Sequence, residues 1–235
     1  MGSRLGTIVG IYANRIYRLA TTYPIEEIGT RFTTTDTATT IGATTFWENG
    51  YDGSGIVVCV IDTGINKSHP ELSGKVVAEK SFVLKKYGYD QDITDPSDEE
   101  GHGTAVAGII AGKGIEDTGH GVAYAAKLLN AKVFGSEGHA TTAGMIAAIE
   151  WCVSNDADVI NISIGGLIEY DDPLIKAVRE AVEQGVVVVI AAGNEGSEGR
   201  GTMQICTPGA APLAITVGAV TTTYAVEDYT SIGPT

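Results

Sequence analysis

The chain has 235 residues with a net charge of −14, and 43% of them are hydrophobic against 19% charged. This length and balance predict one large folded domain with a sizeable core rather than a disordered chain. The acidic surplus disfavours nucleic acid and anionic membrane as partners and is compatible with polypeptide partners. No apolar stretch reaches the roughly 18 residues of a membrane span. The three cysteines, Cys59, Cys152 and Cys206, lack close spacing and predict neither a disulfide framework nor a zinc site.

The first forty residues give weak structural signals. Residues 7–12 suit a strand, and a second apolar pair follows at Ile16 and Tyr17. Residues 21–40 are polar, rich in threonine and without a clear period, which is typical of a linker. A short helix is expected over residues 43–48, where Asn49-Gly50 ends it.

From residue 56 onward, strand and helix patterns alternate. Apolar, β-branched runs predict buried strands at 56–61, 128–134, 159–164, 186–192 and 213–220. Helices are predicted from His102, over 141–154, and from Pro173 to Gly185, the last with Asp172 as its N-cap. This alternation predicts an α/β fold with a mostly parallel central sheet and helices on both faces.

Polar residues follow the predicted strands where such folds place their chemistry. Asp62 ends the first buried run, Ser163 lies at the end of another, and Asn194 follows a third. His102 opens a helix rich in small residues. Because the carboxyl ends of parallel strands meet at one edge of a sheet, we expect these residues to converge on one crevice.

The segments around these residues resemble motifs of the subtilisin-like serine proteases, the peptidase S8 family. The matching segments, in chain order, are V-I-D-T-G at 60–64, H-P-E-L at 69–72, G-H-G-T-A-V-A-G at 101–108, I-N-I-S-I-G-G at 160–166 and A-A-G-N-E-G at 191–196. The segment at 229–234 also resembles the family, and the likeness covers about residues 42–235. The resemblance implies a three-layer subtilisin-like fold and a serine endopeptidase acting on polypeptide substrates, without a cofactor for catalysis.

The resemblance assigns three catalytic roles. His102 corresponds to the general base, Asp62 to the carboxylate that orients it, and Asn194 to a donor for the oxyanion. Three further segments correspond to substrate-binding positions. They are the edge Ser163, Ile164 and Gly165, the opposite edge Gly138, His139 and Ala140, and the pocket wall Ala191, Ala192 and Gly193. Such edges bind an extended peptide as an added strand.

The resemblance also divides the chain. Residues 5–18 resemble the last strand of the family's inhibitory propeptide, so residues 1–20 are expected to be its end and to act as an intramolecular inhibitor. Residues 21–40 would then be a linker with the maturation cleavage site, and 41–235 an incomplete catalytic domain. The parent protein is expected to be secreted and monomeric.

Two departures from the family pattern change these expectations. No G-T-S-M-A segment, which carries the family's nucleophile, occurs in residues 1–235. We therefore expect a chain truncated before the serine and inactive as given. Glu71 corresponds to a calcium ligand, but Ile115 stands where an oxygen ligand is typical, so a structural calcium is an open expectation.

Other functions fit the sequence less well. Asp-Thr-Gly, the signature of aspartic proteases, occurs at 62–64 and 117–119, but that family is nearly all β. Without a nucleophile, the same fold could instead be an inactive peptide-binding protein. A nucleotide-binding domain is disfavoured, because no G-x-G-x-x-G follows a strand and no G-x-x-x-x-G-K-[ST] occurs.

Overall fold

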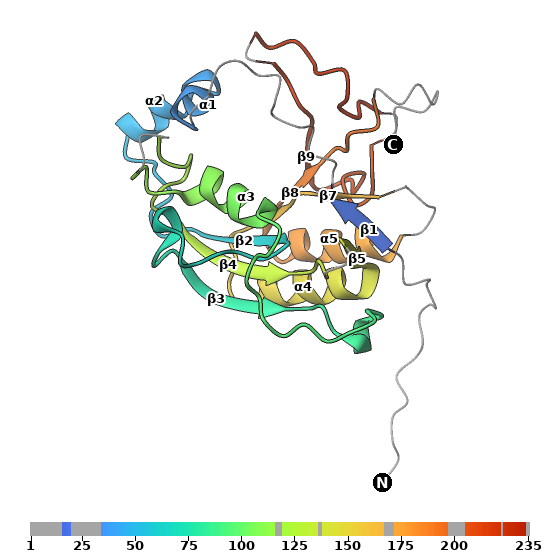
Figure 1. Ribbon diagram of the computed structural model, residues 1–235. Helices are drawn as coiled ribbons and strands as arrows, with labels where there is room; N and C mark the ends of the chain where they lie inside the picture. Colours follow the sequence, from blue (N-terminus) through green and yellow to red (C-terminus); the bar gives the residue numbers. More distant parts are fainter. Residues whose placement is uncertain are drawn as a thin grey trace.

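The central element of the structure, a computed structural model, is a six-stranded sheet (Figure 1). The structure describes residues 16–19, 34–115, 119–135, 138–166, 172–196, 205–221 and 223–233. The sheet has the order β3-β4-β2-β6-β8-β9, and every pairing in it is parallel. Its strands are β2 (Val57–Asp62), β3 (Val76–Ser81), β4 (Lys127–Lys132), β6 (Val159–Ile162), β8 (Val187–Ala191) and β9 (Ile215–Val217). The predicted mostly parallel α/β fold is confirmed.

Strand β2 lies inside this sheet, between β4 and β6, and side chains from both of its faces are buried. Cys59 and Ile61 pack into the core on one face, and Val58 and Val60 pack into the core on the other. This two-sided burial explains the unbroken apolar run in the sequence, because neither face of the strand meets water.

Helices cover both faces of the sheet (Figure 1). Helix α3 (His102–Ala111) packs Ala107 and Ala111 against the face that carries Val58. Helices α4 (Thr142–Ser154) and α5 (Pro173–Glu183) cover the other face. Two shorter helices, α1 (Thr34–Thr40) and α2 (Ala43–Glu48), precede the sheet, and 3-10 turns occur at η2 (Pro70–Leu72) and η3 (Lys85–Tyr87).

Side-chain caps fix where the two long helices begin. The Thr141 hydroxyl accepts a hydrogen bond from Gly144 N–H at 3.1 Å and starts α4. The Asp172 carboxylate accepts one from Leu174 N–H at 2.8 Å, with Pro173 in the first turn of α5. The sequence prediction of this second cap is confirmed, because both residues have the chemistry that a helix N-terminus requires.

A second, three-stranded sheet has the order β5-β1-β7. Strand β1 (Ile16–Leu19) pairs antiparallel with β5 (His139–Thr141) on one side and with β7 (Ile164–Gly165) on the other. A segment from the beginning of the chain therefore joins two segments that are more than a hundred residues away in sequence. Residues 7–12, expected as a strand, lie outside the described residues.

Several expected boundaries differ from the structure. Residues 34–40, assigned to a linker, form α1. Strand β3 was not predicted, because its sequence Val-Val-Ala-Glu-Lys-Ser mixes apolar and charged residues. The run at 159–164 is divided between β6 and β7, and the run at 213–220 forms only the three residues of β9.

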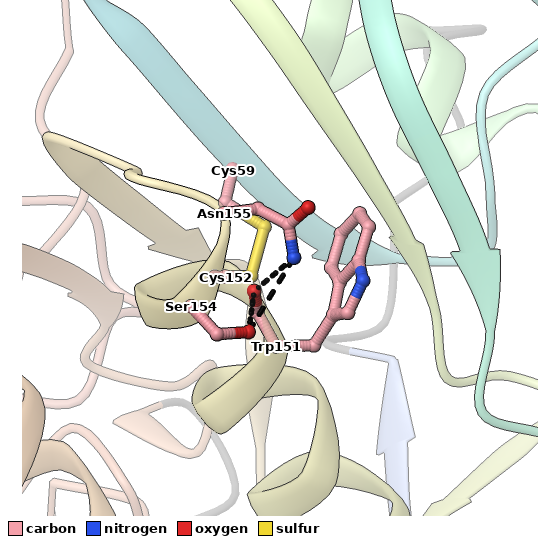
Figure 2. The surroundings of a disulfide bond; sticks show 5 residues. All are labelled: Cys59, Trp151, Cys152, Ser154 and Asn155. Carbon is pink, nitrogen blue, oxygen red and sulfur yellow. Dashed lines mark hydrogen bonds between the residues drawn. A yellow bond between two sulfur atoms is a disulfide. The ribbon is translucent and has the colours of Figure 1, made fainter.

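A disulfide links Cys59 in β2 to Cys152 in α4, and the sequence reading of the cysteines was wrong on this point (Figure 2). The two residues are 93 positions apart, but both are fully buried where α4 crosses the sheet. The sequence did not predict this pair, because spacing along the chain does not show which side chains face each other across two packed elements. The third cysteine, Cys206, is a buried free thiol.

Candidate active site

The site is built around Asp62 and His102, at the carboxyl end of β2 and the start of α3. The imidazole Nδ1 of His102 lies 2.7 Å from Oδ1 of Asp62. Asp62 is fully buried, whereas the His102 side chain is 19% exposed. The carboxylate also accepts a hydrogen bond from the backbone N–H of Thr63 at 2.7 Å. A buried carboxylate on one imidazole nitrogen leaves the other nitrogen for proton transfer.

Close packing of backbone brings the helix to the strand. A side chain at Gly103 would place its Cβ 2.2 Å from the Gly64 carbonyl and 3.1 Å from Asp62 Cβ. Only glycine fits at that position, so the first turn of α3 rests directly on the turn after β2. This contact explains the glycine after the histidine, whereas Gly101 before it has a φ of +96°, a conformation that favours glycine.

Asp98 holds the segment that leads into α3. Its carboxylate accepts hydrogen bonds from the Thr63 hydroxyl at 2.8 Å and from the N–H groups of Gly101 and Thr104 at 2.9 Å each. Burial alone would raise the pKa of Asp98, but the hydrogen bonds from Thr104, Gly101 and Thr63 bring it below its usual value. Asp98 is therefore an anion that fixes Thr63, next to the catalytic candidate, to the helix start.

A buried lysine supports the same turn from the neighbouring strand. Lys132 is the partner of Asp62 in the β2–β4 register and is 3% exposed. Its ammonium donates to the carbonyls of Thr63 at 2.5 Å and Ser97 at 3.0 Å. Burial lowers the pKa of Lys132, and nearby carboxylates, Glu99 first, oppose this shift. The lysine thus ties the turn after Asp62 to the loop that carries Asp98.

The contact with Asp62 changes the proton affinity of His102. The hydrogen bond to Asp62 raises the pKa of His102, partial burial opposes it, and the charges of Asp62 and Asp98 add to the rise. A pKa above the usual value makes the imidazole a stronger base, which suits a group that must remove a proton from a hydroxyl.

The other candidates lie on the same edge of the sheet. Ser163 directly follows β6, and Ala191 is the last residue of β8, with Asn194 in the bend three residues later. Since β2, β6 and β8 are parallel neighbours, their carboxyl ends bring these residues to one side of the sheet. Asn194 and Ser163 are half-buried, and Gly193 and Ala192 are buried.

The two predicted substrate edges are brought together, with a strand between them. Tyr17 of β1 is the register partner of Ala140, and Arg18 is opposite both His139 and Gly165. Leu19 is opposite Ile164. The chain thus already carries an extended peptide between the segments 138–140 and 163–165 (Figure 1).

A polar cluster lies behind the predicted pocket wall. The Glu195 carboxylate accepts hydrogen bonds from the Cys206 thiol at 2.9 Å and from the Ser231 hydroxyl at 2.8 Å. Burial is the first cause that raises the pKa of Cys206 to about 12, and Glu195 adds to it, so the thiol stays neutral. A Cβ at Gly193 would meet all three side chains, the closest atom being the Glu195 carboxylate, so this glycine lets the cluster approach the wall.

Glu71 uses both carboxylate oxygens to hold the loop after α3. They accept hydrogen bonds from the N–H groups of Gly114 at 2.5 Å and Ile115 at 2.6 Å, and Glu71 is 9% exposed. These two contacts are with N–H donors, whereas calcium requires oxygen ligands, and a calcium ion at Glu71 stays a prediction. Within the described ranges, His, Cys, Asp and Glu side chains form no group of three or more that could hold a metal ion.

Comparison with known proteins identifies the family. The model of the Subtilase family, Peptidase S8, matches residues 53–235. This chain belongs to the subtilase family. The matched range contains Asp62, His102 and Asn194, so these residues lie within a peptidase domain.

Curated relatives agree with this assignment. The chain is 37% identical over 182 residues to Serine protease AprX of Bacillus subtilis, covering 72% of this chain and 39% of that protein. It is 37% identical over 192 residues to the Major intracellular serine protease of Bacillus subtilis, covering 81% of this chain and 59% of that protein. It is 40% identical over 194 residues to Subtilisin E of Bacillus subtilis, covering 82% of this chain and 48% of that protein.

The chain spans less than two thirds of the length of each of these relatives. Among the residues that the structure describes, every helix is too short or too polar to cross a membrane.

The residues that support Asp62 and His102 were not predicted from the sequence. Lys132 was detectable from the sequence, because a lysine inside the buried strand predicted over 128–134 is buried only where it has partners. Asp98 lies in an acidic stretch that reads as a solvated loop. Its role depends on Thr63 and Thr104, which only the fold brings close.

Proposed function

We propose that this protein is a serine endopeptidase of the subtilisin type, in which Asp62 and His102 activate a serine outside residues 1–235. The observation that carries this proposal is the placement of β1, an extended peptide paired on both sides with the two proposed substrate edges. The short contact between Asp62 and His102, 2.7 Å between Oδ1 and Nδ1, supports it from the chemical side.

The proposed reaction begins with proton transfer. Nε2 of His102 removes the proton from the serine hydroxyl as its oxygen attacks the scissile carbonyl, and Asp62 holds Nδ1–H and stabilises the imidazolium that forms. Asn194 donates its side-chain amide to the oxyanion of the tetrahedral intermediate. The imidazolium then gives its proton to the leaving amine, and water releases the acyl group by the same steps.

Substrate binding would use backbone rather than side chains. The edges 138–140 and 163–165 would pair with an extended polypeptide, as they pair with β1, and Ala191, Ala192 and Gly193 would form one wall of a side-chain pocket. Backbone pairing tolerates many sequences, which suits an endopeptidase that acts on polypeptides.

The same placement suggests that the beginning of the chain is an intramolecular inhibitor. Residues 1–20 would be the end of a propeptide, 21–40 a segment with the maturation cleavage site, and β1 would exclude substrate by occupying both edges. We expect a synthetic peptide of residues 5–20 to inhibit the mature enzyme competitively. A peptide with the same composition in scrambled order is the control, and equal inhibition by the two peptides would contradict the proposal.

Secretion of the parent protein as a monomer is also proposed. The disulfide between Cys59 and Cys152 supports an oxidising compartment, where such bonds persist. The relative named for an intracellular location is 37% identical and Subtilisin E 40%, so this proposal rests on the disulfide.

The direct test is peptide hydrolysis by the protein as its gene encodes it. His102→Ala should abolish turnover of a chromogenic peptide, whereas His69→Ala, a change of the same kind outside the catalytic pair, should leave kcat/KM within about twofold. Asn194→Ala should lower kcat by about 10²–10³, the loss known for one oxyanion donor in subtilisin. Full turnover by the His102→Ala variant would contradict the proposal.

The second candidate is a catalytically inactive peptide-binding protein. It is favoured by one observation, the absence of the family's serine segment from residues 1–235. A gene product that binds extended peptides but shows no turnover and no reaction with a serine-directed probe would support it over the peptidase.

A further inference from the structure

Tyr89 links three segments, namely the residues after η3, the residue that follows β4, and strand β5. It follows η3, is 6% exposed, and donates its hydroxyl hydrogen to the Val133 carbonyl at 2.5 Å. The same oxygen accepts the backbone N–H of Thr141 at 3.2 Å. The ring lies nearly parallel to the His139 imidazole, with 6.0 Å between centroids and 11° between planes. One side chain therefore contacts both residues that flank Ala140.

The two edges of strand β5 make different backbone contacts. In an antiparallel pair, only alternate residues exchange backbone hydrogen bonds with the partner, and the residues between them point away. The N–H of Thr141 bonds to Tyr89, and the carbonyl of His139 accepts from Gly135 N–H at 3.3 Å. The backbone of Ala140, between them, is then directed at its register partner Tyr17 in β1.

A strand of three residues needs such support. Short, isolated strands are marginal in water, and among the strands that the structure describes β5 pairs with β1 alone. Removal of β1 would leave β5 without a strand partner in that sheet. The contacts from Tyr89 and Gly135 remain in that case, because they lie on the opposite side of β5.

We propose that Tyr89 is a positioning residue that holds β5 in the geometry needed to pair with the backbone of a bound substrate. The inference rests on the proposed function, because it takes the β5–β1 edge as the substrate edge. It adds a residue that contacts no substrate backbone itself but aligns the Ala140 groups that do.

Neighbouring residues fit this role. A Cβ at Gly144 would lie 2.7 Å from the Tyr89 hydroxyl, so glycine at this position leaves room for the ring. The Thr141 hydroxyl donates to the Tyr87 carbonyl at 2.8 Å, which ties the loop before Tyr89 to the start of α4. Burial raises the pKa of Tyr89, so the hydroxyl keeps its proton and remains a donor.

The first test compares two substrates with the same cleaved bond. One extends over positions equivalent to Ile16–Leu19 and reaches β5, and the other is cut short so that it pairs with β7 alone. Tyr89→Phe keeps the ring and removes the hydroxyl. We expect kcat/KM to fall about tenfold for the long substrate, mainly through KM, and to change less than twofold for the short one. Tyr51→Phe, the same change at an exposed tyrosine, is the control.

An equal decrease in kcat/KM for both substrates, or no decrease for the long substrate, would overturn the proposal. Gly144→Ala provides a second variant that keeps the hydroxyl but displaces it, and it should reproduce the dependence on substrate length. If Tyr89→Phe does not fold, the Gly144→Ala result decides.

Backbone hydrogen exchange tests the inference without turnover. In the whole chain, Tyr89→Phe should accelerate exchange at the amides of Ala140 and Tyr17 and leave that of β2 unchanged. Unchanged exchange at Ala140, or the same acceleration in β2, would overturn the inference. If wild-type protein shows no peptidase activity, the proposed function fails, but this measurement still decides the role of Tyr89.

Discussion

At the scale of single residues, the contact between His102 and Asp62 makes a prediction about pH. The pKa of His102 is raised above about 6.5, so this histidine binds its proton more tightly in the folded than in the unfolded chain. Its contribution to stability is therefore complete below about pH 6.5 and is lost as the pH rises through the raised value. A proton NMR titration of His102 should give a pKa above 6.5 that falls in Asp62→Asn. A pKa at or below 6.5 in the wild type would contradict the pairing.

Glu71 makes a second prediction at this scale. Glu71→Ala removes the charged acceptor of the Gly114 and Ile115 N–H groups, and a hydrogen bond to a charged group contributes about 1.5–3 kcal/mol. Ile115 is exposed, so water replaces part of what its N–H group loses. We expect the free energy of unfolding in urea to fall by about 2–4 kcal/mol. Glu48→Ala, at an exposed glutamate, should change it by less than about 0.5 kcal/mol. Wild-type stability that rises steeply with calcium, and a Glu71→Ala variant that loses this rise, would show a metal site instead.

Among the elements, β2, the strand that ends at Asp62, is tied to α4 by the disulfide. Cys59 and Cys152 are 93 residues apart, and removing a native disulfide typically costs about 2–5 kcal/mol of unfolding free energy. Cys152→Ala should lower stability by that amount, and a strong reductant should bring the wild type close to the variant. Cys206→Ala, at the free thiol, is the control and should lower the unfolding free energy by less than Cys152→Ala does. A thiol titration of the denatured, unreduced chain should find one thiol, and three would contradict the bond.

The predictable elements are those whose own residues carry the pattern. Strand β2 and helices α3 and α5 were found from local features: an apolar run, a glycine-rich helix start, and an Asp-Pro cap. Strands β3 and β5 were missed, because β3 mixes charged with apolar residues and β5 has only three residues. The same limit applies to the site. Motifs predicted that Asp62 and His102 meet, whereas Lys132, Asp98 and Tyr89 act through contacts that exist only after folding.

At the scale of the whole molecule, the part of the chain after residue 210 exposes many apolar side chains. Among the described residues, those more than 45% exposed in this part include Leu213, Ile215, Val217, Val220, Val226 and Ile232. Exposed apolar surface of this kind favours association. We expect residues 1–235 expressed alone to form soluble aggregates in light scattering, and a stable monomer at high concentration would contradict this expectation.

We propose that residues 1–235 supply the acid, the base and the oxyanion donor of a serine peptidase, but not its nucleophile. The most direct measurement is labelling with a fluorophosphonate probe, followed by mass spectrometry to locate the label. We expect no labelled serine within residues 1–235, and we expect labelling of a serine elsewhere in the natural gene product that is lost in His102→Ala. Labelling of a serine within residues 1–235 that also depends on His102 would contradict it.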